Sequence, residues 1–261
     1  MNNVQSPVKA DLSSQTVALD QLLAATPDLA KRIGIIRAAV PGRIAFSTSL
    51  GLEDQAVLHA IAESGSLIDV FTLDTGRHFA ETLETVAASE QRYGLTIRLV
   101  TPDAAETEAL TTRDGVLGFR NSIDARKACC DVRKVRPLNK ALTGASGWIT
   151  GLRREQAASR KTVAFAEFDV GLGLVKLNPM ADWTIAQLDA FIAGNAIPVN
   201  ALHARGFPSI GCAPCTRAIR PGEDIRAGRW WWEQENAETA HKECGLHNRP
   251  LKSAPAPEIR S

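Results

Sequence analysis

The 261-residue chain is long enough to form one large domain, or a core domain with a small appendage. Its 30 Lys and Arg side chains nearly balance 29 Asp and Glu, so the overall charge does not favour nucleic acid or a membrane surface as a partner. The polar N-terminus lacks the apolar core of a signal peptide, and the sequence contains no run of about 18 apolar residues. We therefore expect a cytoplasmic protein without a membrane-spanning helix.

A helical lead-in is predicted for residues 1–40, because Leu19–Val40 has apolar residues at helical spacing around a break at Pro27. After this segment, short apolar runs alternate with helical stretches. The predicted strands are 43–46, 68–73, 96–100, 148–150 and 174–177, and the predicted helices are 53–63, 79–93, 125–142 and 184–193. This alternation predicts an α/β fold for residues 41–229, with a parallel sheet covered by helices on both faces. Residues 230–261 are predicted to form a mobile C-terminal tail.

Polar loops follow three of the predicted strands, and ligands of open parallel sheets bind beyond the carboxyl ends of the strands. The loop residues are Ser47, Thr48, Ser49 and Gly51 after the first strand, Asp74, Thr75, Gly76 and Arg77 after the second, and Gly151, Arg153 and Arg160 after a later one. The first loop enters a helix N-terminus that favours an anion, although helix capping explains its hydroxyls equally well. Three such loops at one sheet edge predict a nucleotide site.

These loops also carry a resemblance to a known family. The motifs Ser-Thr-Ser-Leu-Gly-Leu-Glu-Asp, Leu-Asp-Thr-Gly-Arg, Gly-Leu-Arg-Arg-Glu-Gln and the tail Lys-Glu-Cys-Gly-Leu-His resemble those of assimilatory adenylyl-sulfate (APS) and phosphoadenylyl-sulfate (PAPS) reductases. The resemblance spans about residues 43–247, and the tail hexapeptide is its most specific part. It implies an adenine-nucleotide fold related to the PP-loop pyrophosphatases. The Ser-Gly-Gly-Lys-Asp-Ser pattern of ATP-using relatives is missing from the sequence.

Four of the five cysteines fall in two pairs, Cys129 with Cys130 and Cys212 with Cys215. Side chains at adjacent helical positions diverge by about 100°. A single zinc ion needs its sulfurs within roughly 4 Å of one another, whereas a [4Fe-4S] cluster takes one thiolate per iron at wider separation. The pattern therefore favours one cluster per chain over zinc. Buried apolar cysteines, a redox dithiol and a vicinal disulfide are the other interpretations.

Basic residues near the cysteines have two interpretations each. Lys134, one helical turn after Cys130, either faces both a cluster and an anionic substrate or is a solvated surface lysine. Arg226 and Arg229, spaced three apart, either form one basic face toward the phosphosulfate group or lie on one solvent-exposed side of a helix. The resemblance favours substrate binding in both cases.

The fifth cysteine, Cys244, lies among His241, Lys242 and His247, whose positive charge would enrich the thiolate; an incidental surface cysteine is the alternative. The resemblance implies that Cys244 attacks the sulfur of APS, releases AMP and carries an S-sulfocysteine, with His247 near the substrate. Thioredoxin, or a glutaredoxin-like dithiol, then releases sulfite by thiol exchange. A homo-oligomer is also expected.

The presence of both cysteine pairs favours APS over PAPS, because cluster-lacking PAPS reductases do not keep them. The loop from Ser47 to Gly51 also offers no Lys or Arg to a 3′-phosphate. PAPS reduction is the alternative within the class. Outside it, an ATP-using PP-loop enzyme and a cluster-bearing sensor are the alternatives.

Overall fold

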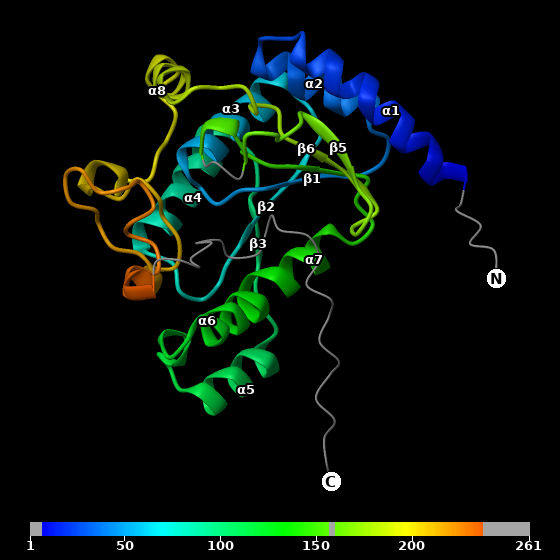
Figure 1. The fold of residues 1–261 in the computed structure, drawn as a ribbon. Helices are drawn as coiled ribbons and strands as arrows, with labels where there is room; N and C mark the ends of the chain where they lie inside the picture. Colours follow the sequence, from blue (N-terminus) through cyan, green and yellow to red (C-terminus); the bar gives the residue numbers. More distant parts are fainter. Residues whose placement is uncertain (1–6, 157–159, 237–261) are drawn as a thin grey trace, which may run out of the picture.

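A computed structural model of the chain describes residues 7–156 and 160–236 (Figure 1). Its helices are α1 (Pro7–Ala24), α2 (Leu29–Ala39), α3 (Leu52–Ser64), α4 (Ala80–Tyr93), α5 (Ala104–Asp114), α6 (Ile123–Cys130), α7 (Arg136–Leu142) and α8 (Ile185–Gly194). Its strands are β1 (Ile44–Ser47), β2 (Asp69–Leu73), β3 (Arg98–Val100), β4 (Gly147–Ile149), β5 (Ala166–Asp169) and β6 (Leu174–Leu177). No helix in these ranges is long and apolar enough to cross a membrane.

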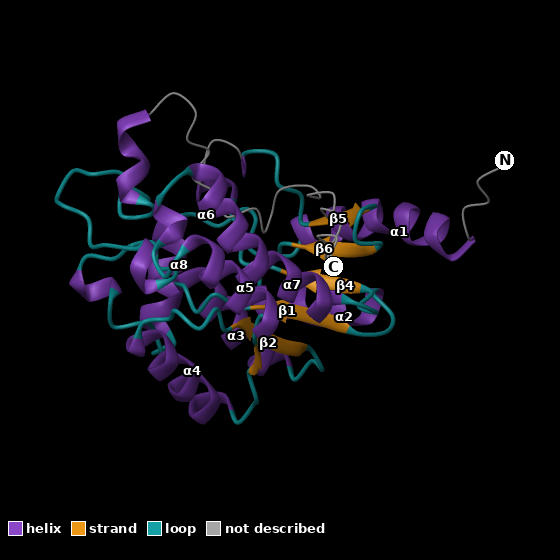
Figure 2. Ribbon diagram, turned by 90° about the horizontal axis from the view of Figure 1, so that it is seen from below, coloured by secondary structure: helices purple, strands orange, loops and turns teal. Residues whose placement is uncertain are grey.

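The strands form one six-stranded sheet in the order β3-β2-β1-β4-β6-β5, and Figure 2 shows this succession from β5 to β2. Every pair is parallel except β5 with β6, which is antiparallel. The predicted α/β fold with a mostly parallel sheet is confirmed. Strand β5 was not predicted, because its four residues alternate weakly and it exists as an edge strand by pairing with β6.

Helices cover both faces of the sheet, as predicted. Because successive side chains of a strand point to opposite faces, Phe46 belongs to a core cluster with residues of α1, α2, α3 and α8, while Ala45 packs with Leu138 of α7. Figure 1 shows α1 and α2 on one side of the strands and α7 on the other. The two cores keep the sheet rigid, so the loops at its carboxyl edge start from fixed points.

The direction of the chain crossovers reverses between β1 and β4. Helices α3 and α4, which connect β1 to β2 and β2 to β3, contribute to the core on one face. Helix α7, which precedes β4, packs on the opposite face. Adjacent strands whose crossovers leave on opposite faces open a crevice at their carboxyl ends, and ligands of doubly wound sheets bind there. The functional site is therefore expected beyond Ser47 and Ile149.

The predicted helix over 125–142 is present but is not uniform. It consists of α6, a π-helical turn at Asp131–Val135, and α7. Wide turns of this kind are frequent at functional sites. Helix α5 was not predicted, because none of its residues is buried and so no apolar pattern marks it. Its start is fixed instead by Asp103, whose side chain accepts a hydrogen bond from Glu106 N.

Candidate active site

The loop after β1 has a fixed shape. The indole Nε1–H of Trp148 donates to Ser47 Oγ at 2.8 Å, and the N–H of Thr48 donates to the carbonyl of Phe71 at 2.8 Å. The N–H of Leu50 donates to Thr48 Oγ1 at 3.0 Å, and Leu50 has a φ of 62° although it is not glycine. A buried residue in this left-handed conformation is held by its surroundings. The predicted site residues Ser47, Thr48 and Ser49 thus lie in an ordered turn.

Asp54, in the first turn of α3, joins this loop to the one after β4. Its Oδ2 accepts hydrogen bonds from the N–H and the Oγ–H of Ser49, each at 2.6 Å, and the carboxyl also accepts from the N–H of Gly151. A Cβ atom at Gly151 would lie 2.3 Å from Asp54 Oδ1, so this position needs a glycine. Burial raises the pKa of the Asp54 carboxyl to about 6, while the hydrogen bonds from Ser49 oppose that rise.

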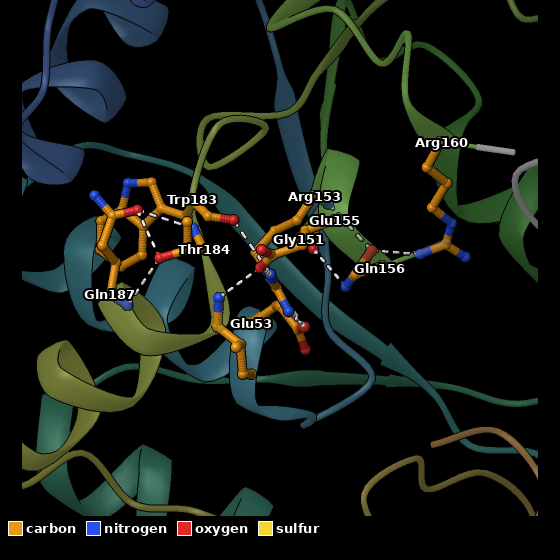
Figure 3. A network of polar contacts seen from close by, with 10 residues as sticks. Glu53, Gly151, Arg153, Glu155, Gln156, Arg160, Trp183, Thr184 and Gln187 are labelled. Carbon is orange, nitrogen blue, oxygen red and sulfur yellow. Dashed lines mark hydrogen bonds and ion pairs between the residues drawn. The ribbon is translucent and has the colours of Figure 1, made fainter. Parts of the chain in front are cut away.

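Arg153, predicted to bind substrate, has protein partners on several sides (Figure 3). Its guanidinium donates to Glu53 Oε1 at 2.8 and 3.1 Å, to Glu155 Oε2 at 3.3 Å and to the carbonyl of Trp183 at 3.2 Å. Arg160 donates to Gln156 Oε1, which also accepts from the N–H of Arg153. Both arginines therefore belong to one network that ties α3 to the loop after β4, and their substrate contacts stay a prediction.

The loop after β2 connects the nucleotide loops to the cysteines. Asp74 Oδ1 accepts from the N–H of Gly76 at 2.9 Å, which closes a tight turn. Thr75 Oγ1 lies 3.3 Å from Cys212 Sγ, and the Thr75 carbonyl accepts from Arg133 at 2.7 Å. Arg77 stacks over the Phe119 ring at 4.9 Å from its centroid. The Asp-Thr-Gly-Arg motif, which is one of the three predicted nucleotide loops, therefore contacts the cysteine pocket directly.

One pocket brings together the two cysteine pairs, which are far apart in sequence. Its lining consists of Arg77, Phe119, Arg126, Cys129, Cys130, Arg133, Lys134, Cys212, Cys215, Arg229 and Trp230. The four cysteines of the described chain are thiols, so the vicinal disulfide is not formed. Lys134 is half-buried and lines the pocket, and its contact with substrate stays a prediction.

The thiols in this pocket influence one another. Burial and the neighbouring thiols of Cys212 and Cys130 raise the pKa of Cys215 to about 12. Burial disfavours the Cys212 thiolate as well, but the charge of Lys134 and the hydrogen bond with Thr75 outweigh it and lower the pKa of Cys212. Four thiols at such close quarters would ionise together only with positive charge beside them.

The pocket suits an anionic, sulfur-ligated group. Among the described residues, no set of three or more His, Cys, Asp or Glu side chains is placed to hold a single metal ion. The buried Nε–H groups of Arg133 and Arg229, which line the pocket, have no hydrogen-bond acceptor within the described chain. Buried donors of this kind are costly unless a partner is bound. Four thiols with guanidinium donors around them match the ligands and the charge of an iron–sulfur cluster.

The outer wall of the pocket was missed by sequence reasoning. Trp230 lies between the guanidiniums of Arg126 and Arg229, at 4.4 and 4.8 Å from its ring centroid. Arg126 Nε donates to Glu233 at 2.5 Å, and both side chains are almost completely buried. Phe119 packs edge-on against Trp232. The run of three tryptophans was visible in the sequence, but no spacing rule connects it to the cysteines.

Arg226 and Arg229 do not share a helix. Residues 221–228 form turns, and Arg229 pairs in an isolated bridge with Thr216, so the helical interpretation is wrong. Arg229 is buried and lines the pocket, whereas Arg226 does not line it. Cys244 and His247 lie outside the described residues, and their roles stay predictions. The predicted mobile tail of residues 230–261 starts too early, because Trp230 is buried and Trp231–Asn236 form a 3-10 helix; the mobility of residues 237–261 stays a prediction.

Comparisons with known proteins agree on one family. Residues 43–218 match the family model described as the phosphoadenosine phosphosulfate reductase domain. The adenosine 5′-phosphosulfate reductase of Agrobacterium fabrum is 49% identical over 243 residues, which cover 93% of this chain and 91% of that protein. The enzyme of the same name from Rhizobium meliloti is 52% identical over 220 residues, covering 84% and 81%.

A solved structure shows the same fold. The phosphoadenylyl-sulfate reductase from Candida auris, determined as a phosphate complex, matches with a TM-score of 0.61 at 23% identity, over 84% of this chain and 99% of that chain. At this level of identity the likeness concerns the fold alone. It agrees with the sheet and crossovers described above.

Proposed function

Because the chain belongs to the phosphoadenosine phosphosulfate reductase family, and within it to the adenosine 5′-phosphosulfate reductases, we propose that it is an oxidoreductase that converts adenylyl sulfate to sulfite and AMP in sulfate assimilation. The proposal rests on about 50% sequence identity to relatives of that name over most of the chain. The arrangement of the loops and the cysteine pocket agrees with it. The loop after β2, which lies next to the loop after β1, contacts the thiol pocket through Thr75. A nucleotide in those loops would direct its sulfate toward basic residues of the pocket.

The protein's own groups divide the work of binding. The loops after β1 and β4 would hold the adenylyl part, since they lie at the carboxyl ends of adjacent strands. Lys134 and Arg229 line the pocket and would stabilise negative charge on the phosphosulfate as sulfur transfers. Cys129, Cys130, Cys212 and Cys215 would hold a [4Fe-4S] cluster. When bound, the cluster supplies structural support and charge and need not change its redox state.

The sulfur chemistry proceeds in two displacements. The Cys244 thiolate attacks the sulfur of adenylyl sulfate, an S–S bond forms, and AMP leaves with the electron pair of the broken S–O bond. A reduced dithiol such as thioredoxin then attacks Cys244 Sγ, and sulfite leaves with the S–S electron pair. The second thiol of the donor resolves the mixed disulfide. The dithiol thus supplies both electrons that reduce sulfate sulfur to sulfite.

Substrate choice follows from the partners of the arginines. Arg153 is engaged by Glu53, Arg154 donates to the Val163 carbonyl at 2.8 Å, and Arg160 donates to Gln156. An additional 3′-phosphate would have to compete with these interactions for a bidentate partner. This supports adenylyl sulfate over phosphoadenylyl sulfate. Action in the cytoplasm, where thiols stay reduced, and a homo-oligomeric state belong to the same proposal.

The test is sulfite release by the anaerobically purified protein with thioredoxin as reductant. Adenylyl sulfate should give a higher kcat/KM than phosphoadenylyl sulfate, with one AMP formed per sulfite. Equal or better turnover of phosphoadenylyl sulfate would reject the substrate choice and keep the thiol mechanism. Absence of sulfite from both nucleotides would reject the function.

A further inference from the structure

Asp54 occupies the place where a doubly wound sheet usually receives an anion from its ligand. It lies in the first turn of the 13-residue helix α3, beside the crevice between β1 and β4. Helix N-termini and loop N–H groups at such a switch point favour negative charge. Here donors from both loops point to the Asp54 carboxylate: the N–H and Oγ–H of Ser49 from the first loop and the N–H of Gly151 from the second.

The surroundings are shaped around this carboxylate. Asp54 is only 8% exposed. The absence of a side chain at Gly151 makes room for Oδ1, since a Cβ there would approach it to 2.3 Å. The neighbouring Glu53 carries a second negative charge, which Arg153 offsets at 2.8 Å. Asp54 and Glu53 thus both contact the loop after β4. Asp54 accepts from the Gly151 backbone, and Glu53 pairs with the Arg153 side chain.

We propose that Asp54 is an internal anion that holds the loops after β1 and β4 in their nucleotide-binding geometry and excludes phosphate and pyrophosphate from their backbone donors. It is thus a positioning residue that also determines specificity. A nucleoside triphosphate would need to place its terminal phosphates on donors that the protein has already filled. A nucleotide whose sulfate lies against Lys134 and Arg229 of the cysteine pocket makes no such demand. This role rests on the proposed function only in taking these loops as the nucleotide site.

Electrostatics support this role at the pH where the protein would work. Burial raises the pKa of Asp54 to about 6, and the charge of Glu53 adds to the rise. The carboxyl is therefore ionised at pH 8. Two like charges at close range in a buried site repel strongly. A bound phosphate would add to the charge of Asp54 and Glu53, against the single guanidinium of Arg153.

Pyrophosphate, without added metal, is the probe. Asp54→Ala removes both the charge and the bulk, Asp54→Asn removes the charge and keeps the bulk, and Glu63→Gln removes the same charge from the exposed far end of α3. Isothermal titration at pH 8 should show Asp54→Ala binding pyrophosphate at least about tenfold more tightly than the wild type, which corresponds to about 1.4 kcal/mol. The pyrophosphate affinity of Asp54→Asn should lie between those of Asp54→Ala and the wild type. The affinity of Glu63→Gln should equal that of the wild type.

A second measurement separates this role from a purely structural one. Pyrophosphate should become a competitive inhibitor of adenylyl sulfate in Asp54→Ala, and the KM for adenylyl sulfate should rise more than kcat falls. Loss of a merely structural contact would not create a new inhibitor. If Asp54→Ala does not fold, the comparison of Asp54→Asn with Glu63→Gln decides. Binding no tighter than in Glu63→Gln would overturn the proposal. The titration needs no turnover, so its result stands apart from that of the sulfite assay.

Discussion

The nucleotide loops and the cysteine pocket satisfy their polar groups in opposite ways. At the loops, Asp54 and Glu53 supply acceptors for the donors around them. In the pocket, the buried Nε–H groups of Arg133 and Arg229 have no acceptor within the described chain. The first region carries its own anion, and the second has donors left for one. Since orphaned buried donors destabilise a fold, we expect a bound anion to stabilise the pocket more than the loops.

Removing a thiol from the pocket gives the largest expected effect. Cys212→Ser should abolish the brown colour and the bound iron, about four atoms per chain in the anaerobically purified wild type. Iron analysis and visible absorption measure this. Cys244→Ser is the matched control, because it should keep the iron, bind adenylyl sulfate and release no sulfite. Stoichiometric zinc without iron in the wild type would contradict the assignment of the pocket.

Breaking the buried ion pair behind the pocket comes next. Glu233→Gln removes the carboxylate that faces the buried Arg126 charge, since the two side chains are 2% and 6% exposed. The free energy of unfolding should fall by about 3 kcal/mol, measured by urea titration. Glu81→Gln removes the carboxylate of the Arg205 pair, in which Arg205 is 60% exposed, and should cost less than about 1 kcal/mol. Equal losses in the two variants would show that the Arg126 pair is not special.

These contacts mark how far the sequence could predict the site. Ser47–Gly51, Asp74–Arg77 and both cysteine pairs were recognisable because each is a contiguous motif at a strand end or on a helix. The ion pair of Arg126 with Glu233 spans 107 positions, and the Trp148 bond to Ser47 spans 101. No local pattern encodes such pairings, since the folded sheet creates them. Asp54 was visible as part of a motif, but its acceptor role depends on a loop that follows a different strand.

The pH dependence of stability tests the loops with a smaller effect. Asp54 has a pKa of about 6 when folded and 3.8 as its ordinary value, so the folded state disfavours the ionised form. The contribution of Asp54 to the free energy of unfolding is therefore greatest below pH 3.8. That contribution is lost as the pH rises through 6. Relative to Asp54→Asn, the wild type should lose about 1–2 kcal/mol between pH 5 and pH 8. Urea titrations at the two pH values measure it, and a pH-independent difference would refute the cause.

The smallest expected effect concerns the buried indole that fixes Ser47. Because an indole N–H only donates, Ser47 Oγ acts as an acceptor toward Trp148 and keeps its own proton for another partner. Trp148→Phe keeps most of the apolar bulk and removes that donor. The free energy that stabilises the ordered loop after β1 should fall by about 1 kcal/mol. We expect the KM for adenylyl sulfate to rise by roughly three- to tenfold with kcat nearly unchanged, measured by sulfite release. Ser47→Ala should act similarly, and the double variant should be no worse than the more impaired single one. Additive losses would mean that the two residues act separately.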